Sequence, residues 1–209
     1  MTATRQVRMA PDEMTIVLPG TWTRVPLDDP DTTTAFVKRL VKRQVGTADR
    51  LARARRDTVQ DLVANAGQAV GIGVHTYLMS LEILPGVPFP AALLFLDVDW
   101  PDESHGARDA GDLEAALAAG FEDAELGEAR FGAFARRTEL VEQQVGDETL
   151  LTLRLEYVVP YPDGSRVLLA RANVPNIPHP EPFALLFNEI IDSISFPAPE
   201  PSVAAEPRA

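Results

Sequence analysis

Alternation of apolar and polar residues in the C-terminal half of the chain limits its fold more than any other feature. In Leu151–Val159 every second residue is apolar, which is typical of a strand with one buried face. Residues 162–164 read Pro-Asp-Gly, a turn sequence in which glycine tolerates positive φ, and an apolar stretch follows at Val167–Val174. The pattern therefore predicts an antiparallel hairpin.

Further segments extend this sheet and place helices beside it. Residues 75–83 alternate, and residues 91–98 are apolar on both faces, as in a central strand. The remaining predictions are strands at residues 14–18, 22–25 and 131–141, and helices at residues 109–119 and after Pro182. The predicted fold class is α+β, an antiparallel β-sheet of about six strands flanked by helices.

Length and composition fit one such domain. The chain has 209 residues, of which 45% are hydrophobic, enough for one substantial core. We expect a single domain over residues 13–196. Residues 1–12 show no periodicity, and residues 197–209 are rich in Pro, Ala and Glu, so both segments are expected to be disordered tails.

The strongest helical signal lies near the N-terminus, in residues 32–66. At 100° per residue, the apolar positions from Val37 to Ala66 fall within an arc of about 140°. Gly46 leaves this phase unchanged, so the pattern fits either one long amphipathic helix or a helix pair. Arg55 falls inside the apolar stripe, where it must extend its charge to solvent, pair with a carboxylate, or mark a break.

The same segment concentrates positive charge in an acidic chain. The net charge is −12, yet residues 35–66 hold eight basic and three acidic residues, a net +5 that leaves −17 for the rest. An acidic chain argues against nucleic-acid binding, because phosphate neutralisation needs a basic surface. The cations opposite the apolar stripe are candidates for binding another protein or a second copy of the chain: Lys38, Arg39, Lys42, Arg43, Arg50, Arg53 and Arg56. The alternative is that they are only solvated or paired with their own acidic neighbours.

The chain offers no residue set for catalysis, and we expect no metal and no cofactor. The absence of cysteine excludes disulfides and thiolate sites, and the three histidines are scattered. His75 lies on an apolar strand face and is interpreted as a core histidine rather than a base or ligand. His105 lies in an acidic loop, residues 97–112, interpreted as solvated rather than as a Ca²⁺ site. His179 lies between two prolines in a connector.

Localisation is inferred from what the chain lacks. It has no stretch of about 18 apolar residues that could span a bilayer, and its first residues lack the apolar region of a secretory signal. We therefore expect a cytoplasmic protein without a membrane span.

Three segments resemble the Mog1/PsbP-like superfamily. They are the opening MTIVLPGTW, the hairpin YVVPYPDGSRVLLARANVPN and the ending FALLFNEIIDSISF. The resemblance implies an antiparallel sheet flanked by helices and binding to other proteins, which in that superfamily are a small GTPase, photosystem subunits or secretion effectors. The chain also resembles uncharacterised proteins of high-GC bacteria with this fold, some of them near type VII secretion genes.

These observations favour a non-enzymatic adaptor, chaperone or accessory protein that acts through protein–protein binding, with a link to bacterial secretion implied by the resemblance. The alternative is a small-molecule binding protein with a pocket between sheet and helix. An enzyme of unrecognised type is the third hypothesis, and a cluster of titratable residues in one deep cleft would favour it.

Overall fold

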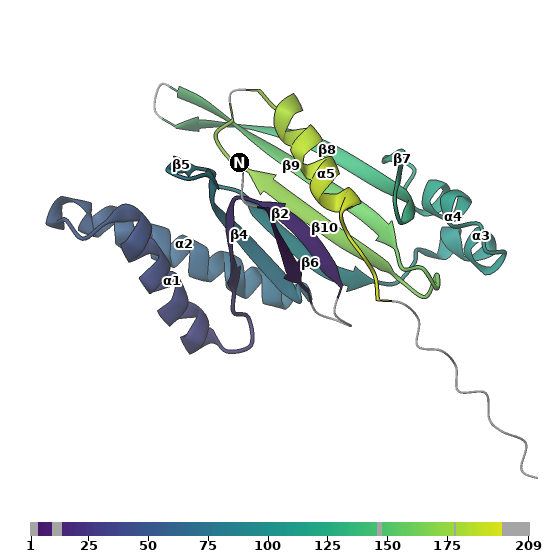
Figure 1. Cartoon of the computed structure of the whole chain (residues 1–209), viewed down its shortest axis with the longest axis horizontal. Coiled ribbons are helices and arrows are strands. Elements are labelled where there is room, and N and C mark those ends of the chain that lie inside the picture. The colour runs from purple at the N-terminus through teal and green to yellow at the C-terminus, as the bar shows by residue number, and fades with distance from the viewer. Residues whose placement is uncertain (1–3, 10–13, 146–147, 178, 198–209) are drawn as a thin grey trace, which may run out of the picture.

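The chain folds as an α+β protein around one large antiparallel sheet (Figure 1). The structure is a computed structural model that describes residues 4–9, 14–145, 148–177 and 179–197. Within these residues the sheet has eight strands in the order β3-β4-β6-β10-β9-β8-β7, with β5 paired to β4, and β1 and β2 form a separate two-stranded sheet. The predicted fold class is confirmed, with eight strands in the main sheet where about six were expected.

The strands follow the sequence pattern closely. Their bounds are β1 Thr4–Arg8, β2 Thr15–Pro19, β3 Thr21–Val25, β4 Thr76–Leu84, β5 Val87–Pro88, β6 Ala92–Val98, β7 Glu125–Ala129, β8 Gly132–Val145, β9 Glu148–Pro160 and β10 Val167–Val174. The helices are α1 Pro30–Val45, α2 Ala52–Gly71, α3 His105–Asp109, α4 Leu113–Gly120 and α5 Glu181–Asp192, with 3₁₀ turns at Asp49–Leu51 and Asp102–Ser104. The predicted hairpin is β9–β10, and Gly164 in its turn has a φ of 68°.

Both faces of the sheet are buried, but to different extents. One face packs beneath α5 and the β1–β2 sheet, where Phe95, Tyr157 and Phe187 are almost fully buried (Figure 1). On the opposite face Ala69 of α2 covers one end and Leu117 of α4 covers the other. Between these two helices the middle of that face carries charged side chains.

Two local predictions are wrong, and one strand was not predicted. Residues 4–8 were assigned to a tail but form β1, which pairs with β2 and places Val7 against the core. The acidic loop contains a 3₁₀ turn and α3, and β7 was not predicted as a strand. Each of these segments is held by backbone pairing or by neighbouring elements rather than by its own apolar period. The rest of the two predicted tails, apart from Met9 and Pro197, lies outside the described residues.

Residues 30–71 form a helical hairpin rather than one rod. Asp29 caps α1 by accepting a hydrogen bond from the Thr32 amide at 2.7 Å. The helix ends at Gly46, whose φ of 87° favours glycine. The chain then reverses, so that α1 and α2 lie side by side at one end of the sheet with their connection at the far end (Figure 1).

Arg55 explains how this reversal is held. Its guanidinium donates hydrogen bonds to the carbonyl oxygens of Gly46 and Ala48, at 3.0 and 2.9 Å. Of the three roles open to an arginine in the apolar stripe, it therefore marks the break. A charged donor thereby satisfies the carbonyl group of Gly46, the C-cap of α1, and shares the carbonyl of Ala48 with the Leu51 amide.

Candidate functional site

The seven cations predicted for partner binding all lie on the α1–α2 hairpin, and all are exposed. Arg53 lies 3.8 Å from Asp57, and within the described residues the other six have no carboxylate within ion-pair distance. The arginines between residues 108 and 171 behave differently. Each of those seven has a carboxylate within 4.0 Å: Arg108, Arg130, Arg136, Arg137, Arg154, Arg166 and Arg171.

A groove of about 1120 Å³ runs between α1 and α2, and we call it the hairpin groove. Its residues are Thr34, Lys38, Val41, Lys42, Thr47, Ala52, Arg55, Arg56, Val59, Gln60, Val63 and Ala64. Four of these twelve are basic, none is acidic, and the three valines give it an apolar floor. The structure thus brings Lys38, Lys42 and Arg56 together with Arg55, whereas Arg39, Arg43, Arg50 and Arg53 do not line the groove.

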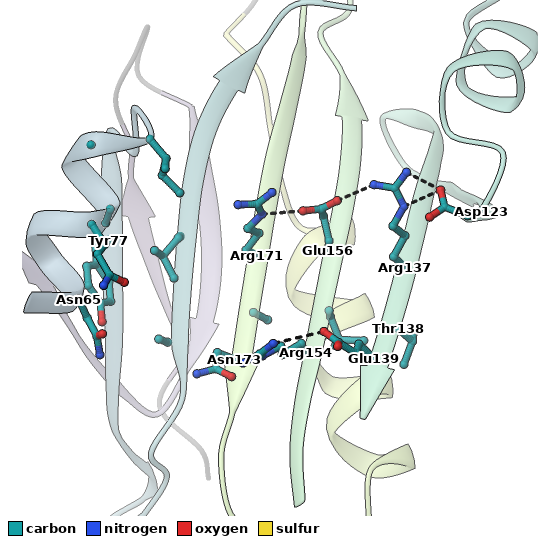
Figure 2. A pocket seen from close by; sticks show the side chains of 18 residues that line it. Asn65, Tyr77, Asp123, Arg137, Thr138, Glu139, Arg154, Glu156, Arg171 and Asn173 are labelled. Carbon is teal, nitrogen blue, oxygen red and sulfur yellow. Dashed lines mark hydrogen bonds and ion pairs between the residues drawn. The ribbon is translucent and has the colours of Figure 1, made fainter. Parts of the chain in front are cut away.

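A second groove, of about 1190 Å³, lies between α2 and the open part of the sheet, and we call it the sheet groove (Figure 2). Asn65, Gln68 and Ala69 line it from α2, Ile72 lines it just beyond the end of that helix, and most of the facing side chains come from β4, β6, β10, β9 and β8. It lies where the alternative hypothesis expects a pocket, between sheet and helix.

Charged side chains cross the floor of the sheet groove as a ladder (Figure 2). Glu156 accepts a hydrogen bond from Arg171 at 2.6 Å and another from Arg137 at 2.9 Å. Both arginines stand directly opposite Glu156 on the neighbouring strands. Arg137 also donates to Asp123 at 2.8 Å, and Arg154 pairs with Glu139 at 3.4 Å.

The ladder is neutral overall, because three arginines face three carboxylates. Its hydrogen bonds shift the pKa values of Asp123 and Arg137. The bond from Arg137 lowers the pKa of Asp123 despite partial desolvation, and the bond to Asp123 raises the pKa of Arg137. Asp123 and Arg137 therefore stay charged at neutral pH and form a fixed ion pair.

His75 belongs to a polar cluster on another part of the sheet. Asp97 accepts a hydrogen bond from the Tyr161 hydroxyl at 2.8 Å and lies 3.1 Å from an Arg166 nitrogen. His75 Nε2 lies 3.6 Å from Asp97, too far for a hydrogen bond, while Nδ1 is 3.1 Å from the Thr76 hydroxyl. Burial raises the pKa of Asp97, but the contacts with His75, Tyr161 and Arg166 outweigh it and the net pKa is lowered.

This cluster places Asp, His and Thr in series but does not form a nucleophile site. Thr76 is fully buried, so its hydroxyl cannot reach a substrate. The ring of His75 is mostly buried, with 19% of its side chain exposed, which agrees with a core position.

The remaining histidines stand apart from each other. His105 begins α3 and lies 4.0 Å from Asp102, whereas His179 is exposed ahead of α5. In the described ranges, no group of three or more His, Cys, Asp or Glu residues is arranged to hold a metal ion. Across those same ranges, none of the helices combines the length and the apolar character that a membrane crossing requires.

No protein-family model matches the chain, and no curated protein or solved structure matches it significantly.

Sequence reasoning missed the ladder, although part of the signal was available. Arg154 and Glu156 occupy the polar positions of the alternating β9 strand, so their place on the non-core face could be predicted. Their partners could not be predicted, because Arg137, Arg154 and Arg171 meet carboxylates 14 to 19 residues away, and the pairing depends on strand register.

Proposed function

We propose that this is a non-enzymatic adaptor or accessory protein that acts in the cytoplasm and binds another protein through the α1–α2 hairpin. The observation that carries the proposal is the contrast between its arginines. Those between residues 108 and 171 each have a carboxylate within 4.0 Å, whereas six exposed cations of the hairpin have no such partner in the described residues.

The charge distribution supports a protein partner with an acidic surface. Unpaired cations on a projecting element attract and orient such a surface, which raises the association rate and disfavours partners with a basic surface. The rest of this chain carries a net −17, so nucleic acid would be repelled outside the hairpin. The resemblance to the Mog1/PsbP-like superfamily and its secretion-linked branch also favours an adaptor or chaperone.

A capture experiment with matched variants tests this function. The charge-reversed protein carries Lys42→Glu, Arg43→Glu, Arg53→Glu and Arg56→Glu, and its control carries Lys42→Arg, Arg43→Lys, Arg53→Lys and Arg56→Lys. Both should fold, because all four side chains are exposed. In native cell extract at low salt, the wild type and the control should recover the same protein, or a second copy of the chain, and the charge-reversed form should lose it. Equal recovery by all three would refute the proposal.

A small-molecule binding function is a second candidate, and the sheet groove favours it. The groove combines apolar side chains such as Leu94 and Ile72 with the amides of Asn65, Gln68 and Asn173. A thermal-shift screen should then show stabilisation by one chemical class, which is lost when the groove is filled by Ala92→Phe. No stabilisation across the screen would leave the sheet groove without this role.

A further inference from the structure

The outer part of the α1–α2 hairpin has apolar surface that the protein itself leaves partly uncovered. In α2 the buried residues are Ala66 and Ala69, near the end that packs on the sheet. Val59 and Val63, farther out, are only half-buried and line the hairpin groove together with the buried Val41. Two helices that pack only on each other leave one side of their shared apolar seam open.

The length of the hairpin groove suits a short helix. Its lining on α2 runs from Ala52 to Ala64, about 18 Å at roughly 1.5 Å per residue. A helix of three to four turns would match that length and would lie in the groove as the third member of a small bundle. An extended segment fits less well, because helices offer no free backbone edge and the strand's own N–H and C=O groups would face valines without partners.

The positive charges around the groove favour an occupant that carries negative charge. Lys38 and Lys42 stand on the α1 side, and Arg55 and Arg56 stand on the α2 side, with no carboxylate among the lining residues. A helix with apolar residues toward the valines would therefore have carboxylates along both flanks of that stripe. A second copy of the hairpin is excluded as the occupant by the same charges, since four cations would face four cations.

We propose that the hairpin groove binds an acidic amphipathic helix of a partner protein. This rests on the proposed function and adds the shape and chemistry of the partner segment. The helix inserts apolar residues spaced i, i+3 and i+4 between α1 and α2, and its Glu or Asp side chains pair with Lys38, Lys42 and Arg56. Arg55 supports the site by holding the hairpin connection.

A peptide library tests the proposal with defined probes. Every peptide is about four turns long and carries one apolar stripe, while the flanking positions vary among Glu, Lys and Gln. Peptides selected on the full chain should be enriched in Glu at the flanks. Their affinity should fall by about tenfold or more in a Lys38→Glu, Lys42→Glu, Arg56→Glu variant, and a scrambled peptide of equal composition should not bind. Absence of binders, or binders flanked by Lys or Gln, would overturn the proposal.

Groove-filling variants locate the binding. Ala64→Trp places a large ring in the hairpin groove, whereas Ala54→Trp adds the same ring to an exposed position of α2 outside it. Peptide binding should be lost in the first and retained in the second. If Ala64→Trp does not fold, Gln60→Glu with Ala64→Glu puts carboxylates in the same place. Equal binding by the groove variant and the control would contradict the groove as the site.

The lysine content of the chain gives an independent readout. Lys38 and Lys42 are its only two lysines, and both line the hairpin groove. A carbodiimide that joins amines to carboxylates at zero length should therefore link a bound Glu-flanked peptide at these residues. Mass spectrometry that finds the peptide linked only at the chain's N-terminal amine would count against the proposal.

The two proposals fail separately. If charge reversal abolishes partner capture while Ala64→Trp leaves it intact and no peptide binds, the hairpin is a partner surface but does not hold a helix in its groove. If neither change affects capture, both proposals are wrong.

Discussion

Replacing Arg55 is the most direct test of how the hairpin is built. In Arg55→Met the aliphatic part of the side chain can still cover apolar surface, but both hydrogen bonds to the carbonyl oxygens of Gly46 and Ala48 are lost. The affected region is the connection between α1 and α2. In this connection the Gly46 amide donates to the Lys42 carbonyl oxygen, and the Leu51 amide donates to the Ala48 carbonyl oxygen.

The expected cost follows from the surroundings of those two bonds. A hydrogen bond from a charged donor contributes about 1.5 to 3 kcal/mol when it is buried. Here the bond to Gly46 is partly buried and the bond to Ala48 is exposed, so water can replace much of the lost energy. We therefore expect Arg55→Met to destabilise the hairpin connection by about 1 to 2 kcal/mol in total, and Arg55→Lys by less.

Hydrogen exchange is the assay of choice, because the outer hairpin can open without unfolding the sheet. The hydrogen-bonded amides of Gly46 and Leu51 should exchange roughly tenfold faster in Arg55→Met, since about 1.4 kcal/mol corresponds to a factor of ten. The control is Arg53→Met, which removes the exposed ion pair between Arg53 and Asp57 at 3.8 Å. It should change the free energy of opening that is derived from the exchange rates by about a few tenths of a kcal/mol at most. If the two variants behave alike, Arg55 does not hold the connection and the reasoning is wrong.

Two substitutions and one truncation test the fold around these surfaces. Gly20→Ala should lower the unfolding free energy more than Gly164→Ala. Both glycines have positive φ, which strains any other residue by about 1 to 2 kcal/mol. A Cβ at Gly20 would in addition overlap the Glu82 carbonyl oxygen, whereas the nearest neighbour of a Cβ at Gly164 is a leucine methyl group at 3.4 Å. Equal losses of unfolding free energy in urea denaturation would contradict this reasoning. Asp97→Asn should cost about 1 to 2 kcal/mol at pH 7. The pKa of Asp97 is lowered in the folded protein, so the difference in stability between wild type and Asp97→Asn should be present above about pH 4. It should disappear as the pH falls through the pKa of Asp97 in the folded state. A stability difference that does not change with pH would exclude the ion pairs as its cause. Removal of residues 1–8 should lower the melting temperature by about 4 °C or more, because β1 and its pairing with β2 are lost. Removal of residues 198–209 should leave the melting temperature unchanged. If the first truncation also leaves it unchanged, β1 contributes no stability.

Periodicity determined the parts of the fold that depend on local patterns. The alternation in residues 151–159 and the turn at Gly164 placed the β9–β10 hairpin, because a strand with one buried face needs an apolar residue at every second position. The amphipathic stripe placed α1 and α2, and composition identified the basic segment within an acidic chain. β1 could not be found this way, since Val7 is its only apolar residue and its backbone ladder to β2 holds it in place.

Only the tertiary structure decided between a rod and a hairpin. The 100° phase continues through Gly46, so the sequence pattern is the same for a straight helix and for two helices that fold back on each other. The reversal depends on the φ of Gly46 and on the two hydrogen bonds that Arg55 donates to the carbonyl oxygens of Gly46 and Ala48 once the chain has folded back. The hairpin groove exists because of this reversal, which turns one continuous apolar stripe into two facing ones and brings Lys38 and Lys42 opposite Arg56. The ion-pair ladder likewise depends on strand register, because each of its contacts joins residues that the chain keeps apart until the sheet forms.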